Sequence, residues 1–310
     1  MPLEGIHHIT AITGDAPGNV DFYARVLGLR LVKKTVNFDA PDVYHLYFGD
    51  ESGAPGSILT FFEFPGAHRG RAGAGMVHRL VWRVGSAESV AFWERRLADE
   101  GAETRREDGS LVFADPEGLE LEIAPLPEAG DPPLAARSQD VPAEHALLGF
   151  DGVRAYTTDS DRSAELLSDV LDFDRTDDGA WRARGSARHA DLRYDAAPAD
   201  RGIPGAGTVH HIAWASRDED HEDWREAVAR AGAHVTPVID RQYFHSIYFR
   251  EPSGVLFEIA TLSPGFAVDE DPQHLGEALR LPAQHEHLRE KLERTLTPLP
   301  NPRAAREVRS

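Results

Sequence analysis

The sequence predicts an α+β fold built from four copies of one βαβββ module. The clearest repeat lies in two 15-residue segments, SLVFADPEGLELEIA at residues 110–124 and SIYFREPSGVLFEIA at residues 246–260, which share seven identical positions without a gap. Each segment follows a stretch with the apolar spacing of an amphipathic helix, and each helix follows a short apolar strand. The order strand, helix, strands therefore occurs at least twice.

The second and fourth modules show every element of this order. Their first strands are MVHRLVWRV at residues 76–84 and TVHHIAWAS at residues 208–216. Their helices are expected in SAESVAFWERRLADEGAET, residues 86–104, and DHEDWREAVARAGAHVT, residues 220–236. Apolar residues recur in these helices at positions i, i+3 and i+4, whereas the strands are rich in valine, isoleucine and aromatic residues.

The first and third modules repeat the order with less identity. Near the start, GIHHITAIT leads to a helix in APGNVDFYARVLGL and then to strands in RLVKKTVNF, VYHLYFGD and GSILTFFEF. In the middle, FDGVRAYTTD leads to a helix in SDRSAELLSDVLDF and to strands in GAWRARG and HADLRYDA. Four modules thus account for residues 5 to about 262.

The modules fall into two expected domains. Modules one and two occupy residues 1–130, a proline-rich acidic linker occupies 131–146, and modules three and four occupy 147–263. Residues 264–310 form an expected C-terminal arm with one helix in PAQHEHLREKLERTL. We expect this helix to lie on the surface of the body, with a contact in a homo-oligomer as the alternative.

Composition excludes several classes of protein. The formal net charge of −19 disfavours nucleic acid and anionic membranes as partners, because both require a basic surface. No apolar run is long enough to span a membrane and no signal peptide is evident, so a cytoplasmic enzyme is expected. Cysteine is absent, which leaves His, Asp and Glu as side-chain metal ligands.

Aligning the modules gives two informative columns. The first-strand column, one position after the initial histidine, contains His8, Arg79, Val153 and His211. The last-strand column, four positions after the turn glycine, contains Thr60, Glu122 and Glu258. Only modules one and four carry histidine in the first column, and of these only module four adds glutamate.

Two imidazoles and one carboxylate, from His8, His211 and Glu258, are the ligand set of a facial triad that leaves coordination positions open. Such a set favours Fe(II), with Mn(II) as the alternative. A single histidine on a strand is more often a hydrogen-bonded structural residue, but two histidines at one place in matched modules favour ligands. Arg79 and Thr60 show that the repeat does not impose ligands on every copy.

Adjacent histidines open both modules one and four, and alternation along a strand predicts that the two rings of a pair face opposite sides. A shifted register gives a rival assignment in which His7, His78 and His210 are the ligands, with Glu122 and Glu258 as carboxylates. That arrangement would suit a more fully coordinated lyase or isomerase site. His45 and His245 have no matching column and are expected to be structural.

The segment from GIHHITAITGD to LTFFEFPG resembles the start of the hydroquinone-type ring-cleaving dioxygenases of the vicinal oxygen chelate superfamily. IDRQYFHSIYFREPSGVLFEIAT and PGFAVDEDPQHLGEAL match the same family, and the resemblance covers nearly the whole chain. It implies that each expected domain is glyoxalase-like and that modules pair into two half-open β-barrels, with module one joined to module four.

The resemblance also implies roles for individual residues. It supports His8, His211 and Glu258 as the metal ligands, and it implies that Thr10, Arg241 and Tyr248 line the substrate pocket. The first histidines of the pairs, His7 and His210, then lie behind the ligands. Ring cleavage requires an acid or base near the substrate, for which His7, His210 and Tyr248 are the candidates, while Arg241 would stabilise anionic charge.

The expected function is that of an Fe(II)-dependent dioxygenase that opens a hydroquinone or catechol-type ring with O2. A zinc- or nickel-dependent lyase of the glyoxalase I type is one alternative. The other is a metal-free binding protein of the bleomycin-resistance type, which would not need His8, His211 or Glu258.

Overall fold

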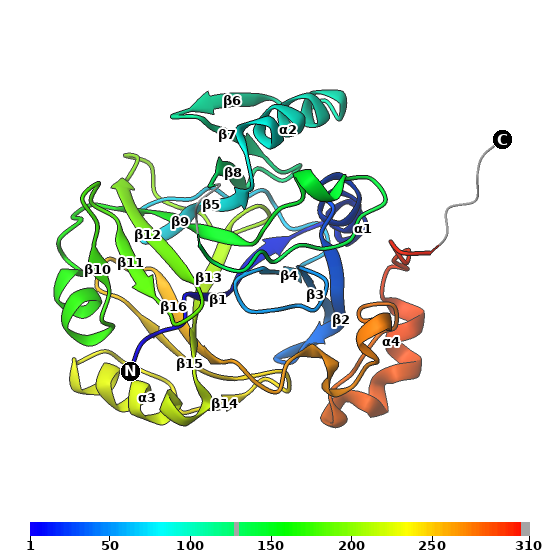
Figure 1. Cartoon of the computed structure of the whole chain (residues 1–310). Coiled ribbons are helices and arrows are strands. Elements are labelled where there is room, and N and C mark those ends of the chain that lie inside the picture. The colour runs from blue at the N-terminus through cyan, green and yellow to red at the C-terminus, as the bar shows by residue number, and fades with distance from the viewer. Residues whose placement is uncertain (127–129, 305–310) are drawn as a thin grey trace.

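Two eight-stranded sheets contain the four modules (Figure 1). The computed structural model describes residues 1–126 and 130–304. Residues 127–129 of the expected first domain and residues 305–310 of the expected arm lie outside this range. The predicted α+β fold of four paired βαβββ modules is confirmed.

The first sheet joins modules one and four in the order β14-β15-β16-β13-β1-β4-β3-β2, and it curls into a half-open barrel. Module one supplies β1 (Ile6–Thr13), β2 (Arg30–Asn37), β3 (Ala40–Gly49) and β4 (Ile58–Glu63). Module four supplies β13 (Val209–Ser216), β14 (Ile239–Asp240), β15 (His245–Arg250) and β16 (Leu256–Thr261).

The second sheet joins modules two and three in the order β10-β11-β12-β9-β5-β8-β7-β6. Module two supplies β5 (Met76–Val84), β6 (Thr104–Glu107), β7 (Ser110–Ala114) and β8 (Glu120–Pro125). Module three supplies β9 (Phe150–Thr157), β10 (Asp174–Arg175), β11 (Trp181–Arg184) and β12 (His189–Ala196). Each sheet therefore takes strands from both expected domains.

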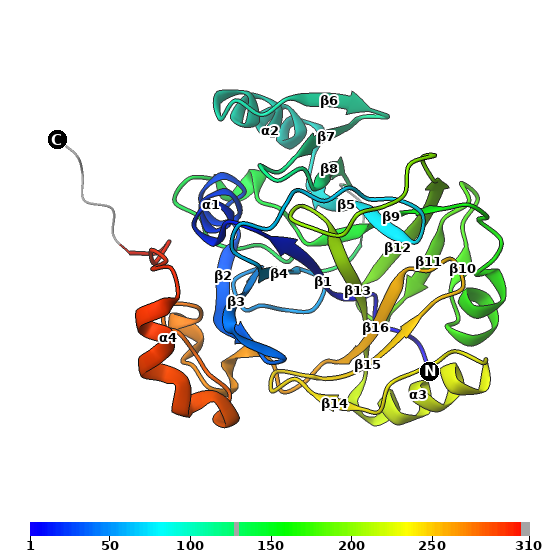
Figure 2. The same cartoon turned by 180° about the vertical axis from the view of Figure 1, so that it is seen from behind.

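Helices connect the strands and cover the outer surface. Figure 2 shows α2 and α3 at opposite ends of the molecule and α4 beside β2 and β3. The helical segments are α1 (Ala16–Val20), which continues as a π-helical stretch (Asp21–Val26), α2 (Ala87–Asp99), a π-helical turn (Leu166–Val170), α3 (His221–Arg230) and α4 (Arg289–Thr295). Short 3₁₀ turns span Ala143–His145, Asp218–Asp220, Phe266–Val268, Pro272–His274 and Ala283–Leu288.

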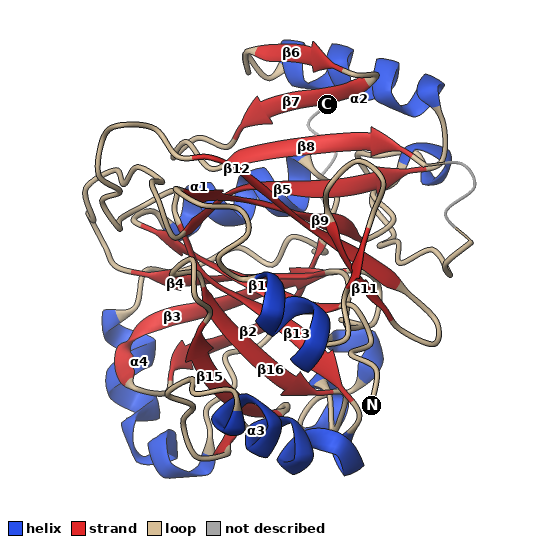
Figure 3. Ribbon diagram, turned by 90° about the vertical axis from the view of Figure 1, so that its left-hand side faces the viewer, coloured by secondary structure: helices blue, strands red, loops and turns tan. Residues whose placement is uncertain are grey.

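The larger of the two apolar clusters among the described residues draws on both sheets, and it includes Trp82, Trp93, Trp214 and Trp224. Burial of large aromatic side chains on this scale is the main source of stability for a chain without disulfides. Figure 3 shows one sheet above the other, with α2 at the top of the molecule and α3 and α4 at the bottom. Within the described ranges no helix is long and apolar enough to cross a membrane.

The C-terminal arm is tied to β2 of the first sheet. The ammonium group of Lys33, fully buried, lies 2.5 Å from Asp269 Oδ1 and also contacts Glu270. Leu279 forms a bridge with Lys34. A buried ammonium requires such carboxylate partners, because an unpaired charge in the interior is costly.

The seam of the first sheet is the antiparallel pair β1–β13, and both strands bulge at their first histidine. The register shifts between Ile6 and His8 on β1, and on β13 it shifts between His211 and Val209. β5 has the same irregularity around His78, where it pairs with β9, so the first strands of modules one, two and four all bulge at this position. A bulged residue leaves the strict alternation of side chains, which decides how the histidine pairs lie.

Candidate metal centre and cavity

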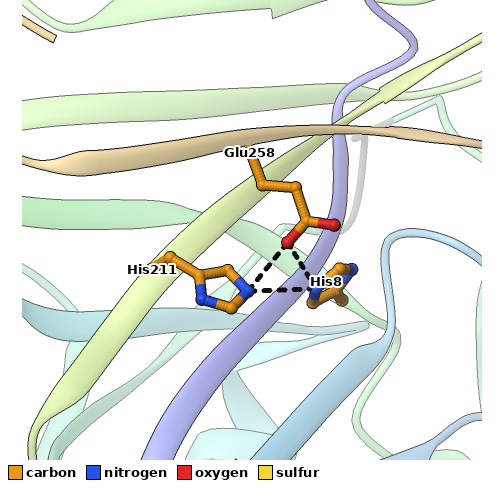
Figure 4. Close-up of side chains that lie close together, drawn as sticks. All are labelled: His8, His211 and Glu258. Atoms are coloured by element: carbon orange, nitrogen blue, oxygen red, sulfur yellow. Dashed lines mark hydrogen bonds and ion pairs between the residues drawn. The ribbon is translucent and has the colours of Figure 1, made fainter. Parts of the chain in front are cut away.

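Three strands of the first sheet bring His8, His211 and Glu258 together (Figure 4). His8 lies on β1, His211 on β13 and Glu258 on β16, so the group needs both ends of the chain. The two Nε2 atoms are 3.3 Å apart, and Glu258 Oε2 lies 3.3 Å from His8 Nε2 and 2.8 Å from His211 Nε2. All three side chains are buried.

The spacing of the three atoms fits a shared cation. Ligands about 2.1 Å from an ion and at right angles to each other lie about 3 Å apart. Glu258 Oε2 is buried and has no hydrogen-bond partner of suitable geometry, although Oε1 accepts a hydrogen bond from Ser246. Among the described residues, these three are the one group of His, Asp or Glu side chains arranged to share an ion.

Electrostatics at this point also favour a cation. Burial alone would raise the pKa of Glu258, but the neighbouring His8 and His211 hold it well below its ordinary value, so the carboxylate is ionised. Burial lowers the pKa of His211, which favours a neutral ring with a free lone pair. An ionised carboxylate and two imidazole lone pairs converging on one point provide the donors that a divalent transition metal prefers.

Each ligand histidine is oriented by the histidine before it. His7 Nδ1 lies 2.9 Å from His8 Nδ1, and His210 Nδ1 lies 2.7 Å from His211 Nδ1. A neutral ring with Nε2 free for a metal carries its proton on Nδ1, so His8 and His211 are the donors and the Nδ1 atoms of His7 and His210 accept. The expectation that the paired rings face opposite sides of the strand is wrong, because the bulges turn both rings toward the same side.

The predicted catalytic histidines differ in their surroundings. His7 is buried behind His8, packs against Phe244 at a ring distance of 4.9 Å, and hydrogen-bonds the backbone of Thr261. His210 is exposed and lines the cavity in front of the three ligands. Burial lowers the pKa of His7 to about 3 and that of His210 to about 4, so both rings are neutral near pH 7.

A cavity of about 200 Å³ opens in front of two of the three candidate ligands, His8 and His211. Its walls are largely aromatic, which suits a flat apolar ligand with a few polar groups. An apolar cavity of roughly 150 Å³ holds a benzene ring, so one substituted ring fits here. The lining residues are His8, Thr10, Asn37, Phe38, Asp39, His45, Tyr47, Phe62, Phe64, His210, His211, Arg241, Phe244 and Tyr248.

The predicted pocket residues Thr10, Arg241 and Tyr248 all line this cavity. Arg241 Nε donates to the Tyr248 hydroxyl at 3.2 Å, and its NH1 group donates to Asp39 Oδ2 at 3.1 Å. Tyr248 is the cross-strand partner of Glu258, which places its ring 5.7 Å from that of His211. A cation and a phenol thus stand beside the candidate metal site.

Sequence reasoning missed His45 and Tyr47 of β3, which also line the cavity. The signal was present, because HLYF at residues 45–48 matches SIYF at residues 246–249 in the equivalent strand of module four. The register agrees: Tyr47 pairs with Thr60 just as Tyr248 pairs with Glu258. The assignment of His45 to a purely structural role overlooked this second match.

In the second sheet an arginine stands where modules one and four have histidine. The Arg79 guanidinium donates to Glu107 at 2.7 Å, Glu120 at 2.6 Å and Glu122 at 3.1 Å. His78 Nε2 lies 2.8 Å from Asp195 Oδ2. In module two, the Arg79 guanidinium supplies the positive charge that a metal ion would supply between modules one and four. The equivalent place in module two is therefore an ion-pair cluster.

We expect Arg79→Met to lower the free energy of unfolding at pH 7 by about 2–4 kcal/mol, because three carboxylates lose a buried partner. Burial opposes ionisation of Glu120, but hydrogen bonds from His78, Arg105 and Arg79 lower its pKa to about 2. Stabilisation from this depressed pKa is present above pH about 4.5 and is lost as the pH falls toward 2. Urea unfolding at pH 7 and pH 3 measures the effect.

The control is Arg105→Met, which removes an exposed arginine from the same carboxylates Glu107 and Glu120. An exposed ion pair contributes about 1 kcal/mol or less, so this variant should stay close to wild type. The difference between Arg79→Met and wild type should shrink at pH 3. An equal difference at both pH values would contradict the account.

Four βαβββ modules paired in this way define the vicinal oxygen chelate, or glyoxalase-like, fold. The chain belongs to the Glyoxalase/Bleomycin resistance protein/Dioxygenase superfamily, whose family model matches residues 5–123 and 149–259. The chain is 45% identical over 304 residues to a Bacillus subtilis (strain 168) protein named "Putative ring-cleaving dioxygenase MhqO", covering 95% of this chain and 96% of that protein.

A second relative is the chlorohydroquinone/hydroquinone 1,2-dioxygenase of Sphingobium indicum, which is 34% identical over 321 residues, with 95% of this chain and 96% of that protein covered. Among solved structures, a crystal structure described as a "putative dioxygenase" from Bacillus subtilis superposes with a TM-score of 0.88 at 43% identity. That superposition covers 97% of this chain and 98% of the other.

Proposed function

We propose that this protein is an Fe(II)-dependent dioxygenase that opens the ring of a hydroquinone or catechol-type phenol with O2. The observation that carries the proposal is the convergence of His8, His211 and Glu258 at the inner end of an aromatic-walled cavity. The named relatives support the same reaction class, since one of them is named for hydroquinone and its chlorinated form. Mn(II) is the alternative metal for this donor set.

His8, His211 and Glu258 would hold the metal beside the cavity that His8 and His211 line. A divalent iron bound there supplies a Lewis-acidic, redox-active centre at which a phenol oxygen and dioxygen are brought together. The protein contributes a fixed, buried ligand set, so no reorganisation is needed when the substrate arrives.

The remaining residues would orient the ring and manage its charge. Arg241 and Tyr248 direct a cation and a phenol toward anionic oxygen on the substrate. Phe62 and Phe244 provide flat apolar walls that position the ring and exclude water. His210, neutral and lining the cavity, accepts from His211 at Nδ1 and so carries its proton on Nε2, which suits it to donate a hydrogen bond to an oxygen of the substrate.

The test is oxygen uptake by protein purified without oxygen. After its bound metal has been measured, the protein is supplied with Fe(II) and then with hydroquinone, substituted hydroquinones or catechols. We expect one O2 consumed per ring opened, dependent on Fe(II). A glyoxalase-type lyase would instead turn over a hemithioacetal with zinc or nickel and consume no oxygen. Absence of uptake with every phenol in Fe(II)-loaded protein would overturn the proposal.

A further inference from the structure

A chain of four polar side chains runs along the wall of the cavity that module one provides. Tyr47 OH lies 2.9 Å from His45 Nδ1, and His45 Nε2 lies 2.8 Å from Thr60 Oγ1. Thr60 Oγ1 lies 2.9 Å from Thr10 Oγ1. Thr10 is two residues from His8 on β1, so the chain ends beside the candidate metal centre.

This series of hydrogen-bonded side chains lies where module four has the carboxylate of Glu258. Thr60 stands in the column of Glu258, and His45 stands in the position of Ser246. Ser246 hydrogen-bonds Glu258, and His45 hydrogen-bonds Thr60 along the same diagonal between strands. Module one has therefore exchanged a metal-facing carboxylate for a line of neutral hydrogen-bonding groups.

The direction of the hydrogen bonds follows from the buried end. In the described part of the chain, the one hydrogen-bond partner of the Tyr47 hydroxyl is His45 Nδ1. Tyr47 is 2% exposed, and donation from its O–H to that nitrogen satisfies the hydroxyl within the protein, without a partner in the cavity. Burial lowers the pKa of His45 well below its ordinary value, which leaves a neutral ring whose single proton is then on Nε2.

The rest of the chain is then determined. His45 Nε2–H donates to Thr60 Oγ1, and the Thr60 hydroxyl donates to Thr10 Oγ1. Thr10 already accepts a hydrogen bond, so its own hydroxyl proton is available to the cavity that it lines. The Thr10 hydroxyl thus donates into the cavity, and the direction of this hydrogen bond is set by His45 and Tyr47 on β3.

We propose that Tyr47, His45 and Thr60 are positioning residues that fix Thr10 as a hydrogen-bond donor to a phenolic oxygen bound in the cavity. The proposal rests on the proposed function for its ligand class. A donor held in one direction stabilises a phenolate more than a hydroxyl that must reorient, because its cost of ordering has been met in the fold. The hydrogen-bonded series Tyr47–His45–Thr60–Thr10, which we call the relay, should therefore lower the pKa of a bound phenol.

The first test is the tautomer of His45 in the full-length chain, before and after loading with Zn²⁺, a diamagnetic ion. Nitrogen-15 spectra of histidine-labelled protein distinguish the two tautomers, and the His45 signals are those lost in His45→Gln. We expect a neutral ring protonated on Nε2 between pH 6 and pH 8. Protonation on Nδ1, or a charged ring, would overturn the proposed direction of the relay.

The second test is the pKa of nitrohydroquinone bound to the Zn²⁺-loaded protein, measured by the visible absorption of its phenolate. Thr60→Val keeps the shape of the side chain but breaks the relay, and we expect it to raise this pKa by about one. Thr60→Ser retains the hydroxyl and should restore the wild-type value. Tyr44→Phe removes a tyrosine hydroxyl from the opposite face of β3, where it donates to the Thr297 carbonyl, and should change nothing.

Equal pKa values in wild type and Thr60→Val would overturn the role of the relay toward substrate. Failure of wild-type protein to bind the phenol would instead count against the proposed function, and the tautomer of His45 would still decide the direction of the relay. The two failures are therefore distinguishable.

Discussion

Glu258→Gln should lose its bound metal and its oxygen uptake, whereas Glu122→Gln should keep both. The two glutamates occupy the same column of the repeat, and each lies on the last strand of its module. Glu258 faces two imidazoles, but Glu122 faces the guanidinium of Arg79. Loss of a ligand from a three-residue site should lower metal affinity more than the 10–100-fold typical of outer hydrogen-bond partners.

Metal content after dialysis and Fe(II)-dependent oxygen uptake measure this prediction. Circular dichroism and thermal unfolding of both variants establish that they are folded. Retention of iron by Glu258→Gln, or an equal loss of iron in Glu122→Gln, would show that the last-strand column does not identify the metal-binding glutamate.

His7→Leu should lower metal affinity by about 10–100-fold without removing a ligand. The ring of His7 is 3% exposed and is the hydrogen-bond partner of His8 Nδ1, so water does not replace it easily. His210→Leu should have a smaller effect on metal affinity, because His210 is exposed and solvent can reach the Nδ1 atom of His211.

Competition with a metal indicator gives the two affinities, and the dependence of turnover on pH separates positioning from proton transfer. The shifted register predicts something different, because in it His7 and His210 are themselves ligands and either variant should lose the metal altogether. Complete loss in both, with His8→Ala still binding the metal, would restore that rival assignment.

The candidate ligand set could be predicted from sequence because repeated modules impose a common register. Position 8 and position 211 occupy the same place in their strands, and Glu258 follows its turn glycine at the same interval as Glu122. The aligned columns therefore indicate which residues occupy equivalent positions in the folded modules. The joining of module one to module four came from a resemblance, since nothing in the local sequence states which modules share a sheet.

The orientation of the histidine pairs could not be predicted from strand alternation. An ideal strand separates adjacent side chains onto two faces, but a bulge of one residue brings both rings to one side. Whether a strand bulges depends on its partner across the seam, and for β1 that partner lies about 200 residues away. The place of His45 beside the cavity could have been predicted from the match of HLYF to SIYF, whereas its hydrogen bond to Thr60 depends on the pairing of β3 with β4.

The seam between β1 and β13 also determines when the metal centre can exist during synthesis. Strands of the second sheet all lie between residues 76 and 196, so that sheet can form while the chain is still incomplete. His8 is synthesised long before Glu258. At about 5–20 residues per second, the time between the synthesis of the two residues is roughly 10–50 seconds. A nascent chain thus carries no complete candidate ligand set, and the three side chains come together only after modules one and four have paired.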